Sequence, residues 1–166
     1  MDPRRSTFRF LAGRLGAYLA AVVVAYLLAA LTATQAVVSR LEAMGVAVPV
    51  PERLAMSLRD LTGMAGMFLP MIAFALLAAF LSAALLCHRL RRYLWPWRPL
   101  VYAAAGAVAL VSIHLALNLA FGLHPVAIAR TWGGLLLQAL AGAAGGLTYL
   151  SLARPGTLVH EPRYAA

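Results

Sequence analysis

The stretch LGAYLAAVVVAYLLAALTA, residues 15–33, decides the fold class. It contains no charged residue, and its length is close to the roughly 20 apolar residues that an α-helix needs to cross a bilayer. A signal peptide is the competing interpretation, because arginines precede the stretch. Its apolar run, however, is longer than the roughly 7–15 residues of a usual signal sequence. We therefore expect residues 15–33 to form a transmembrane helix.

Three further apolar stretches of similar length follow, at residues 66–87, 100–122 and 131–153. The chain of 166 residues is 63% hydrophobic and 11% charged, whereas soluble domains are about 45–50% apolar and about 25% charged. These features predict an all-α integral membrane protein, with four transmembrane helices in a bundle over residues 15–153. Residues 1–14 are then a basic N-terminal segment, residues 34–65 an external loop, and residues 154–166 a short tail.

The arginines predict the orientation of these spans. All fourteen basic residues in the Lys+Arg count are arginines. Four flank the external segments, at positions 40, 53, 59 and 130, and the other ten lie in the N-terminal segment, the connection between the second and third spans, and the tail. The positive-inside rule then places both termini in the cytoplasm, N-in and C-in. Trp95 and Trp97 would lie at the inner boundary of the membrane and Trp132 at the outer one, as in an interfacial aromatic belt.

The composition also indicates an environment. An absence of lysine and an abundance of alanine are typical of GC-rich bacterial genomes, so we expect a multi-pass protein of a bacterial inner (cytoplasmic) membrane. The net charge of +9 does not indicate a nucleic-acid partner, because the arginines flank apolar stretches instead of forming one basic face. The partner that the composition predicts is the lipid bilayer.

The external segment contains an amphipathic pattern, VPVPERLAMSLRDL, at residues 48–61. Pro51 suits the first position of a helix, and leucines 54, 58 and 61 would then lie on one stripe. Two interpretations are open: a short amphipathic helix on the outer membrane surface, or a helical lead-in to the second span.

Two charges near the outer surface form a candidate ion pair. Arg130 precedes the fourth span, at the positive end of its helix dipole, where a cation is unfavourable. Asp60 lies just before the second span and has the opposite charge. We expect the two side chains to pair and to close the outer surface.

Small residues recur along two spans and predict helix contacts. Between helices in lipid, hydrophobicity supplies little drive, so close approach of the backbones matters. The first span has a small residue at every fourth position: Gly13, Ala17, Ala21, Ala25 and Ala29. The fourth span has glycines at comparable spacing: Gly134, Gly142 and Gly146. Contacts within one bundle and contacts between subunits both fit this pattern.

Four polar side chains gather in the outer half of the predicted membrane. At a rise of roughly 1.5 Å per residue, His114 lies about 12 Å from the outer end of the third span. Gln138 and Tyr26 fall at a similar level, and Asn118 lies one turn nearer the outer surface. We expect these groups to point into the bundle, because an unsatisfied polar group in lipid costs several kcal/mol.

Three interpretations of this cluster are open. The first is that the side chains hydrogen-bond across helices and set their register. The second is a solute or proton site, because imidazole can titrate near neutral pH. The third is haem, which we do not expect, since His88 and His114 would differ in depth by roughly 20 Å. With a single cysteine, Cys87, and no acid within any span, we expect no metal, no cofactor and no catalytic residues.

The segment HPVAIARTWGGLLLQALAGAAGGLTYL, residues 124–150, resembles the last span of small, uncharacterised four-span inner-membrane proteins of proteobacteria. This resemblance implies no activity and transfers no site residues. The function we expect is that of a non-enzymatic packing or accessory subunit, which self-associates as a homo-oligomer or joins a larger membrane complex. The alternative is a small oligomeric channel or transporter with a polar site around His114, Asn118 and Gln138.

Overall fold

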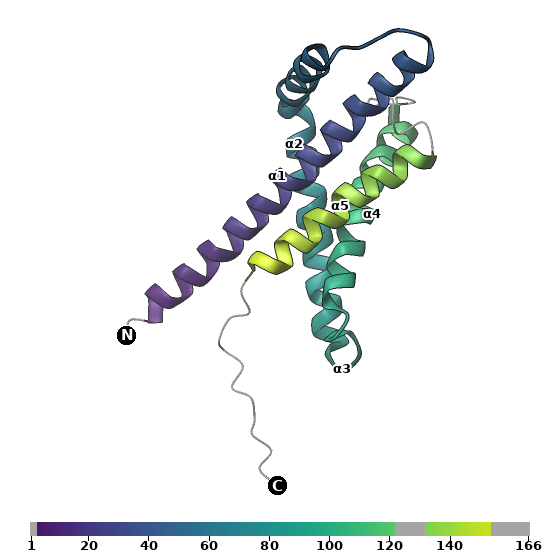
Figure 1. Cartoon of the computed structure of the whole chain (residues 1–166). Coiled ribbons are helices and arrows are strands. Elements are labelled where there is room, and N and C mark those ends of the chain that lie inside the picture. Colours follow the sequence, from purple (N-terminus) through teal and green to yellow (C-terminus); the bar gives the residue numbers. More distant parts are fainter. Residues whose placement is uncertain (1–2, 122–131, 154–166) are drawn as a thin grey trace.

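The computed structural model describes residues 3–121 and 132–153, and every element within these ranges is a helix (Figure 1). The elements are α1 (Pro3–Ala43), α2 (Val50–Arg89), α3 (Arg91–Leu94), α4 (Arg98–Phe121) and α5 (Trp132–Leu152). Four of them, α1, α2, α4 and α5, are long and apolar enough to cross a membrane. The predicted all-α class with four candidate membrane spans is therefore confirmed.

The first two helices are much longer than the apolar stretches that predicted them. α1 has 41 residues, which is about 60 Å at a rise of roughly 1.5 Å per residue. No proline or glycine occurs between residues 34 and 43 to stop it. It ends at Ala43, two residues before Gly45, whose φ of 83° is a left-handed conformation that glycine adopts at low cost. The external loop predicted over residues 34–65 is therefore corrected to a short connection over residues 44–49.

The amphipathic pattern at residues 48–61 lies in the first turns of α2. The helix begins at Val50 with Pro51 in its first turn, and it continues without interruption to Arg89. The structure therefore favours the lead-in over a separate amphipathic helix. Figure 1 shows these first turns running at an angle to the rest of α2. Pro70 lies inside the helix, and a proline there removes one backbone hydrogen bond and permits such a bend.

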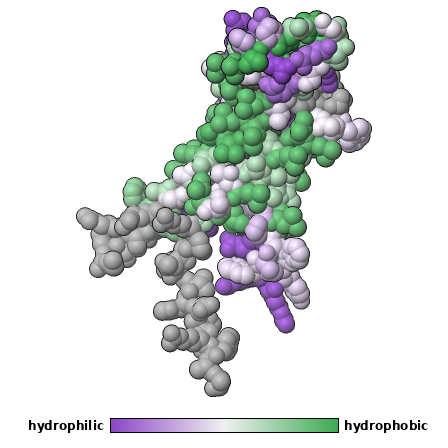
Figure 2. Space-filling view, viewed as in Figure 1, coloured by the Kyte–Doolittle hydropathy of each residue, from purple (hydrophilic) through white to green (hydrophobic). Residues whose placement is uncertain are grey.

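The four long helices contact one another in a ring. α5 packs between α1 and α4, and α2 packs against the same two helices from the other side. The core between them includes Leu76 of α2 and Leu110 of α4, which are almost completely buried. Figure 2 shows hydrophobic residues over the middle of the molecule and hydrophilic residues at both ends. This distribution is the one expected of a protein whose middle lies in lipid.

Glycines bring α4 and α5 into backbone contact. A Cβ added at Gly142 would lie 2.1 Å from the carbonyl oxygen of Gly106, and one at Gly106 would lie 2.1 Å from the carbonyl oxygen of Gly142. One turn further along, a Cβ at Gly146 would lie 2.1 Å from the carbonyl oxygen of Tyr102. No side chain fits at these positions, so the two helices approach as closely as their backbones allow.

The alanines predicted to pack in the first span are buried, and the glycine before them is not. Ala17, Ala21, Ala25 and Ala29 are at most 7% exposed. Ala21 and Ala25 pack against Gly145 of α5. Gly13 lies beyond this contact: a Cβ added there would meet nothing within 4 Å. Figure 1 shows the first turns of α1 running clear of the other helices.

Candidate functional site

Gln138 of α5 is the centre of a buried polar junction. Its side chain is 2% exposed. The amide Nε2 donates a hydrogen bond of 3.1 Å to the carbonyl oxygen of Ala29 on α1, and it lies 3.5 Å from the hydroxyl of Thr32 one turn further on. Gly134 and Gly142, one turn to either side of Gln138, are also buried. The amide therefore lies on the same buried face of α5 as these two glycines.

His114 of α4 lies next to this amide. The imidazole is 6% exposed, and the side chain of Gln138 is its polar neighbour. Its Nδ1 is buried without a hydrogen-bond partner within the described residues. The amide of Gln138 has an acceptor, Oε1, for an imidazole N–H and a second N–H for an imidazole nitrogen, besides the N–H that it donates to Ala29.

The junction joins all four long helices. The ring of Phe68, on α2, lies against His114 with 6.2 Å between ring centroids and an interplanar angle of 39°. The imidazole is thus enclosed by an aromatic ring from α2, the amide of α5 and its own helix, while α1 supplies the carbonyl of Ala29. His114 and Gln138 share one buried site, as their predicted depths and faces indicated.

The other two predicted members of the cluster lie outside this junction. The Tyr26 hydroxyl donates to the carbonyl oxygen of Leu61 on α2, so it fastens α1 to α2. Asn118 is one turn beyond His114 and partly buried. Over residues 3–121 and 132–153, the structure gives its side chain no hydrogen bond. The junction is therefore a pair, His114 and Gln138, with backbone and aromatic neighbours.

Asp60 has a partner that the sequence analysis did not anticipate. The hydroxyl of Thr34, which is 1% exposed, donates a hydrogen bond of 2.7 Å to Asp60 Oδ2. The predicted partner, Arg130, lies outside the described residues. The ion pair that the described residues contain is Arg53 with Glu42, which ties the start of α2 to the end of α1. Asp60 and Thr34 thus extend the α1–α2 contact that Tyr26 begins.

No family model, curated protein or solved structure matches this chain.

The chemistry available to the junction follows from its groups alone. It holds one imidazole, one amide and a backbone carbonyl, with no carboxylate to act as a paired acid or base. Among the described residues, no three His, Cys, Asp or Glu side chains lie close enough together to hold a metal ion. The groups present can donate and accept hydrogen bonds, and the bare Nδ1 of His114 can accept one more.

Two hollows border the helices away from the core. A wide groove of about 620 Å³ runs between α1 and α5 and contains Thr32, which Gln138 also contacts. A smaller hollow of about 230 Å³ lies at the other end of the molecule, where α2, α3 and α4 meet α1.

Sequence reasoning missed Gly106, the partner of Gly142, because a single glycine in an alanine-rich stretch does not stand out by spacing. It also missed the stack of Phe80, Tyr102 and Tyr149, whose ring centroids lie 4.8–5.9 Å apart. These three residues come from three different helices. Only the pairing of the helices brings them together, so no local signal in the sequence could have found the stack.

Proposed function

We propose that the chain is a non-enzymatic subunit of a bacterial inner membrane, which self-associates or joins a larger membrane complex. The observation that carries this proposal is the small-residue face of α1, which continues past the helices that cover it. Ala17 is buried, whereas a Cβ added at Gly13 or Gly16 would meet nothing within 4 Å. A helix from a second copy or a partner could approach the α1 backbone there.

The buried junction supports the same proposal. Gln138 of α5 hydrogen-bonds to the backbone of α1, and His114 of α4 is its polar neighbour. Polar side chains commonly serve in this way to join helices within a membrane. Phe8, Leu11 and Leu15, all more than half exposed, add apolar surface to the uncovered end of α1.

The test is the native mass of the protein extracted in mild detergent, with everything bound to it. We expect the wild-type chain to run as a homo-oligomer or with a partner, and the double variant Gly13→Leu, Gly16→Leu to lose that association. The matched control is Gly63→Leu, Gly66→Leu, because added Cβ atoms at those α2 positions also meet nothing within 4 Å. A wild-type protein that runs as a bare monomer would contradict the proposal.

A small channel or transporter is the second candidate, and the buried, unpartnered Nδ1 of His114 favours it. An acceptor of this kind could bind a solute donor or a proton. The test is solute or proton flux in liposomes. We expect flux to fall at least tenfold in His114→Ala if the junction lies on the path. Flux that is unchanged in His114→Ala would remove the histidine from any such role.

We further propose that both termini lie in the cytoplasm. The first turns of α1, α3 and the last turn of α5 lie at one end of the molecule (Figure 1). The described segments that carry eight of the fourteen arginines, residues 3–14 and 89–98, lie at that end. Arginine in short loops marks the cytoplasmic side of a bacterial inner membrane.

A further inference from the structure

A small hollow at the arginine-rich end of the molecule gathers basic side chains from four elements. Its volume is about 230 Å³, and its walls include Arg14 of α1, His88 of α2, Arg91 of α3 and Arg98 of α4. Among the residues that the structure describes, no acidic side chain lines it. We name it the basic hollow. It lies far from the His114 junction, which is in the half of the molecule near the α1–α2 connection.

The Trp95 ring contacts two of these arginines, Arg91 and Arg98, beside the hollow. The guanidinium carbons of Arg91 and Arg98 lie 5.0 Å and 4.7 Å from the centre of the Trp95 ring, a distance at which cations are attracted to an aromatic face. Within residues 3–121 and 132–153, neither guanidinium forms an ion pair. The structure therefore keeps like charges close together with no carboxylate to neutralise them, an arrangement that a bound anion would stabilise.

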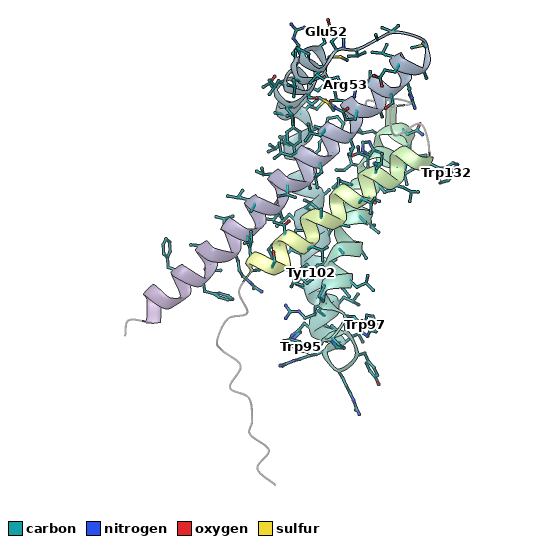
Figure 3. The ribbon with its side chains drawn as sticks, viewed as in Figure 1. Glu52, Arg53, Trp95, Trp97, Tyr102 and Trp132 are labelled. Carbon is teal, nitrogen blue, oxygen red and sulfur yellow. The ribbon has the colours of Figure 1, made fainter. Side chains whose placement is uncertain are left out.

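The position of the hollow indicates where that anion would come from. Trp95 and Trp97 lie together at this end (Figure 3), and tryptophan favours the level of lipid headgroups. The hydrophobic middle of the molecule begins directly next to this end (Figure 2). Leu81 and Leu85, on the exposed side of α2 near the hollow, offer apolar surface for acyl chains.

The size and the side chains select the class of anion. The hollow is smaller than the roughly 300–1,000 Å³ of pockets that enclose drug-sized ligands, so it suits a single small group. Arginine guanidinium groups bind phosphate with paired hydrogen bonds. We propose that the basic hollow binds one phosphate group, carried by an anionic lipid headgroup or present as free phosphate.

The test is native mass spectrometry of the full chain, released from neutral detergent in the presence of phosphatidylglycerol or of phosphatidylcholine with the same acyl chains. We expect the wild type to retain phosphatidylglycerol at least tenfold better than phosphatidylcholine. The variant Arg91→Gln, Arg98→Gln should lose this preference. The variant Arg89→Gln, Arg92→Gln should keep it within about twofold, because it removes the same charge from neighbouring positions that do not line the hollow.

A second pair of variants keeps every charge. Ala84 lines the hollow, whereas Ala78 is an exposed alanine on α2 that does not. Ala84→Phe should fill the hollow and reduce phosphatidylglycerol retention at least tenfold, and Ala78→Phe should leave it unchanged. An equal loss in the two arginine variants, or full retention in Ala84→Phe, would overturn the proposal.

The source of the phosphate is tested by adding inorganic phosphate to the lipid-bound protein. Displacement of phosphatidylglycerol at millimolar phosphate would assign the site to a soluble phosphate. Retention of the lipid in the presence of millimolar phosphate would assign the site to a lipid headgroup. Both results support the proposal that the basic hollow binds a phosphate group. A wild-type chain that retains neither molecule would refute the site.

Discussion

Gly142 shows how a single residue decides whether two helices of this protein can meet. Its substitution by alanine would place a Cβ 2.1 Å from the carbonyl oxygen of Gly106, and that atom is backbone and cannot rotate away. We expect Gly142→Ala to lower the free energy of unfolding by about 1–3 kcal/mol, as overpacking does. Gly133→Ala, on the same helix with nothing within 4 Å, should leave stability unchanged or raise it by up to about 1 kcal/mol. Equal stability of the two variants in a denaturation series would contradict this contact.

The junction of His114 and Gln138 makes a separate residue-scale prediction. A hydrogen bond between the two side chains should appear as a coupling energy in a double-mutant cycle of His114→Leu and Gln138→Leu. We expect about 0.6–1.7 kcal/mol, the range measured for hydrogen bonds between membrane helices. The measurement is unfolding of the four proteins in mixed micelles. Strictly additive effects would mean that the two side chains do not depend on each other.

Much of this junction could be predicted at the residue scale, and some could not. Helical rise places His114 and Gln138 at one depth, and the small residues beside them indicate which face turns inward. Tyr26 and Asn118 satisfied the same criteria, yet neither is bonded to the pair among the described residues. Depth and face do not determine which neighbour a side chain reaches. That choice depends on how the helices pair, and the Tyr26 hydroxyl lies closer to the backbone of α2.

At the scale of elements, the sequence predicted that four helices exist and misjudged where two of them end. The apolar pattern reports only the part of a helix that suits lipid, whereas backbone hydrogen bonding continues until a residue stops it. In α1 the first such residue is Gly45, and α2 starts at Val50. The outer parts of these two helices therefore pack on each other through side chains that an external loop would have left in water.

The bond from Thr34 to Asp60 tests that element-scale contact. Thr34→Val keeps the shape of the buried side chain and removes the donor to the Asp60 carboxylate. We expect a loss of about 1.5 kcal/mol in the free energy of unfolding, the lower end of the range for a hydrogen bond to a charged group, because Asp60 is partly exposed. Thr62→Val is the control, since that hydroxyl bonds only to carbonyls of its own helix. A loss as large in Thr62→Val would show that the α1–α2 bond is unimportant.

At the scale of the whole molecule, two features reinforce each other. The ring of contacts through α1, α5, α4 and α2 buries the polar junction. The even number of spans brings the arginine-rich segments to one end, where they leave a hollow lined by cations. One end is thus suited to anionic headgroups, while the exposed leucine, valine and phenylalanine side chains of the middle are suited to lipid. The sequence could predict that arginines gather at one end and apolar residues in the middle. It could not predict the hollow, because the hollow depends on how α3 turns the chain back.

The orientation can be tested with single cysteines. Cys87 is buried, and its replacement by alanine provides a background for Tyr93→Cys in α3 and Ala47→Cys in the α1–α2 connection, both at exposed positions. Because arginines favour the cytoplasmic face, we expect a membrane-impermeant maleimide to label position 47 in intact spheroplasts, and position 93 only after the membrane is opened. Leu81→Cys, on the exposed side of α2, should resist the reagent in both cases, since lipid covers it. Labelling of position 93 in intact spheroplasts would reverse the orientation. It would also place the basic hollow against the outer leaflet, where phosphate binding would need a different lipid source.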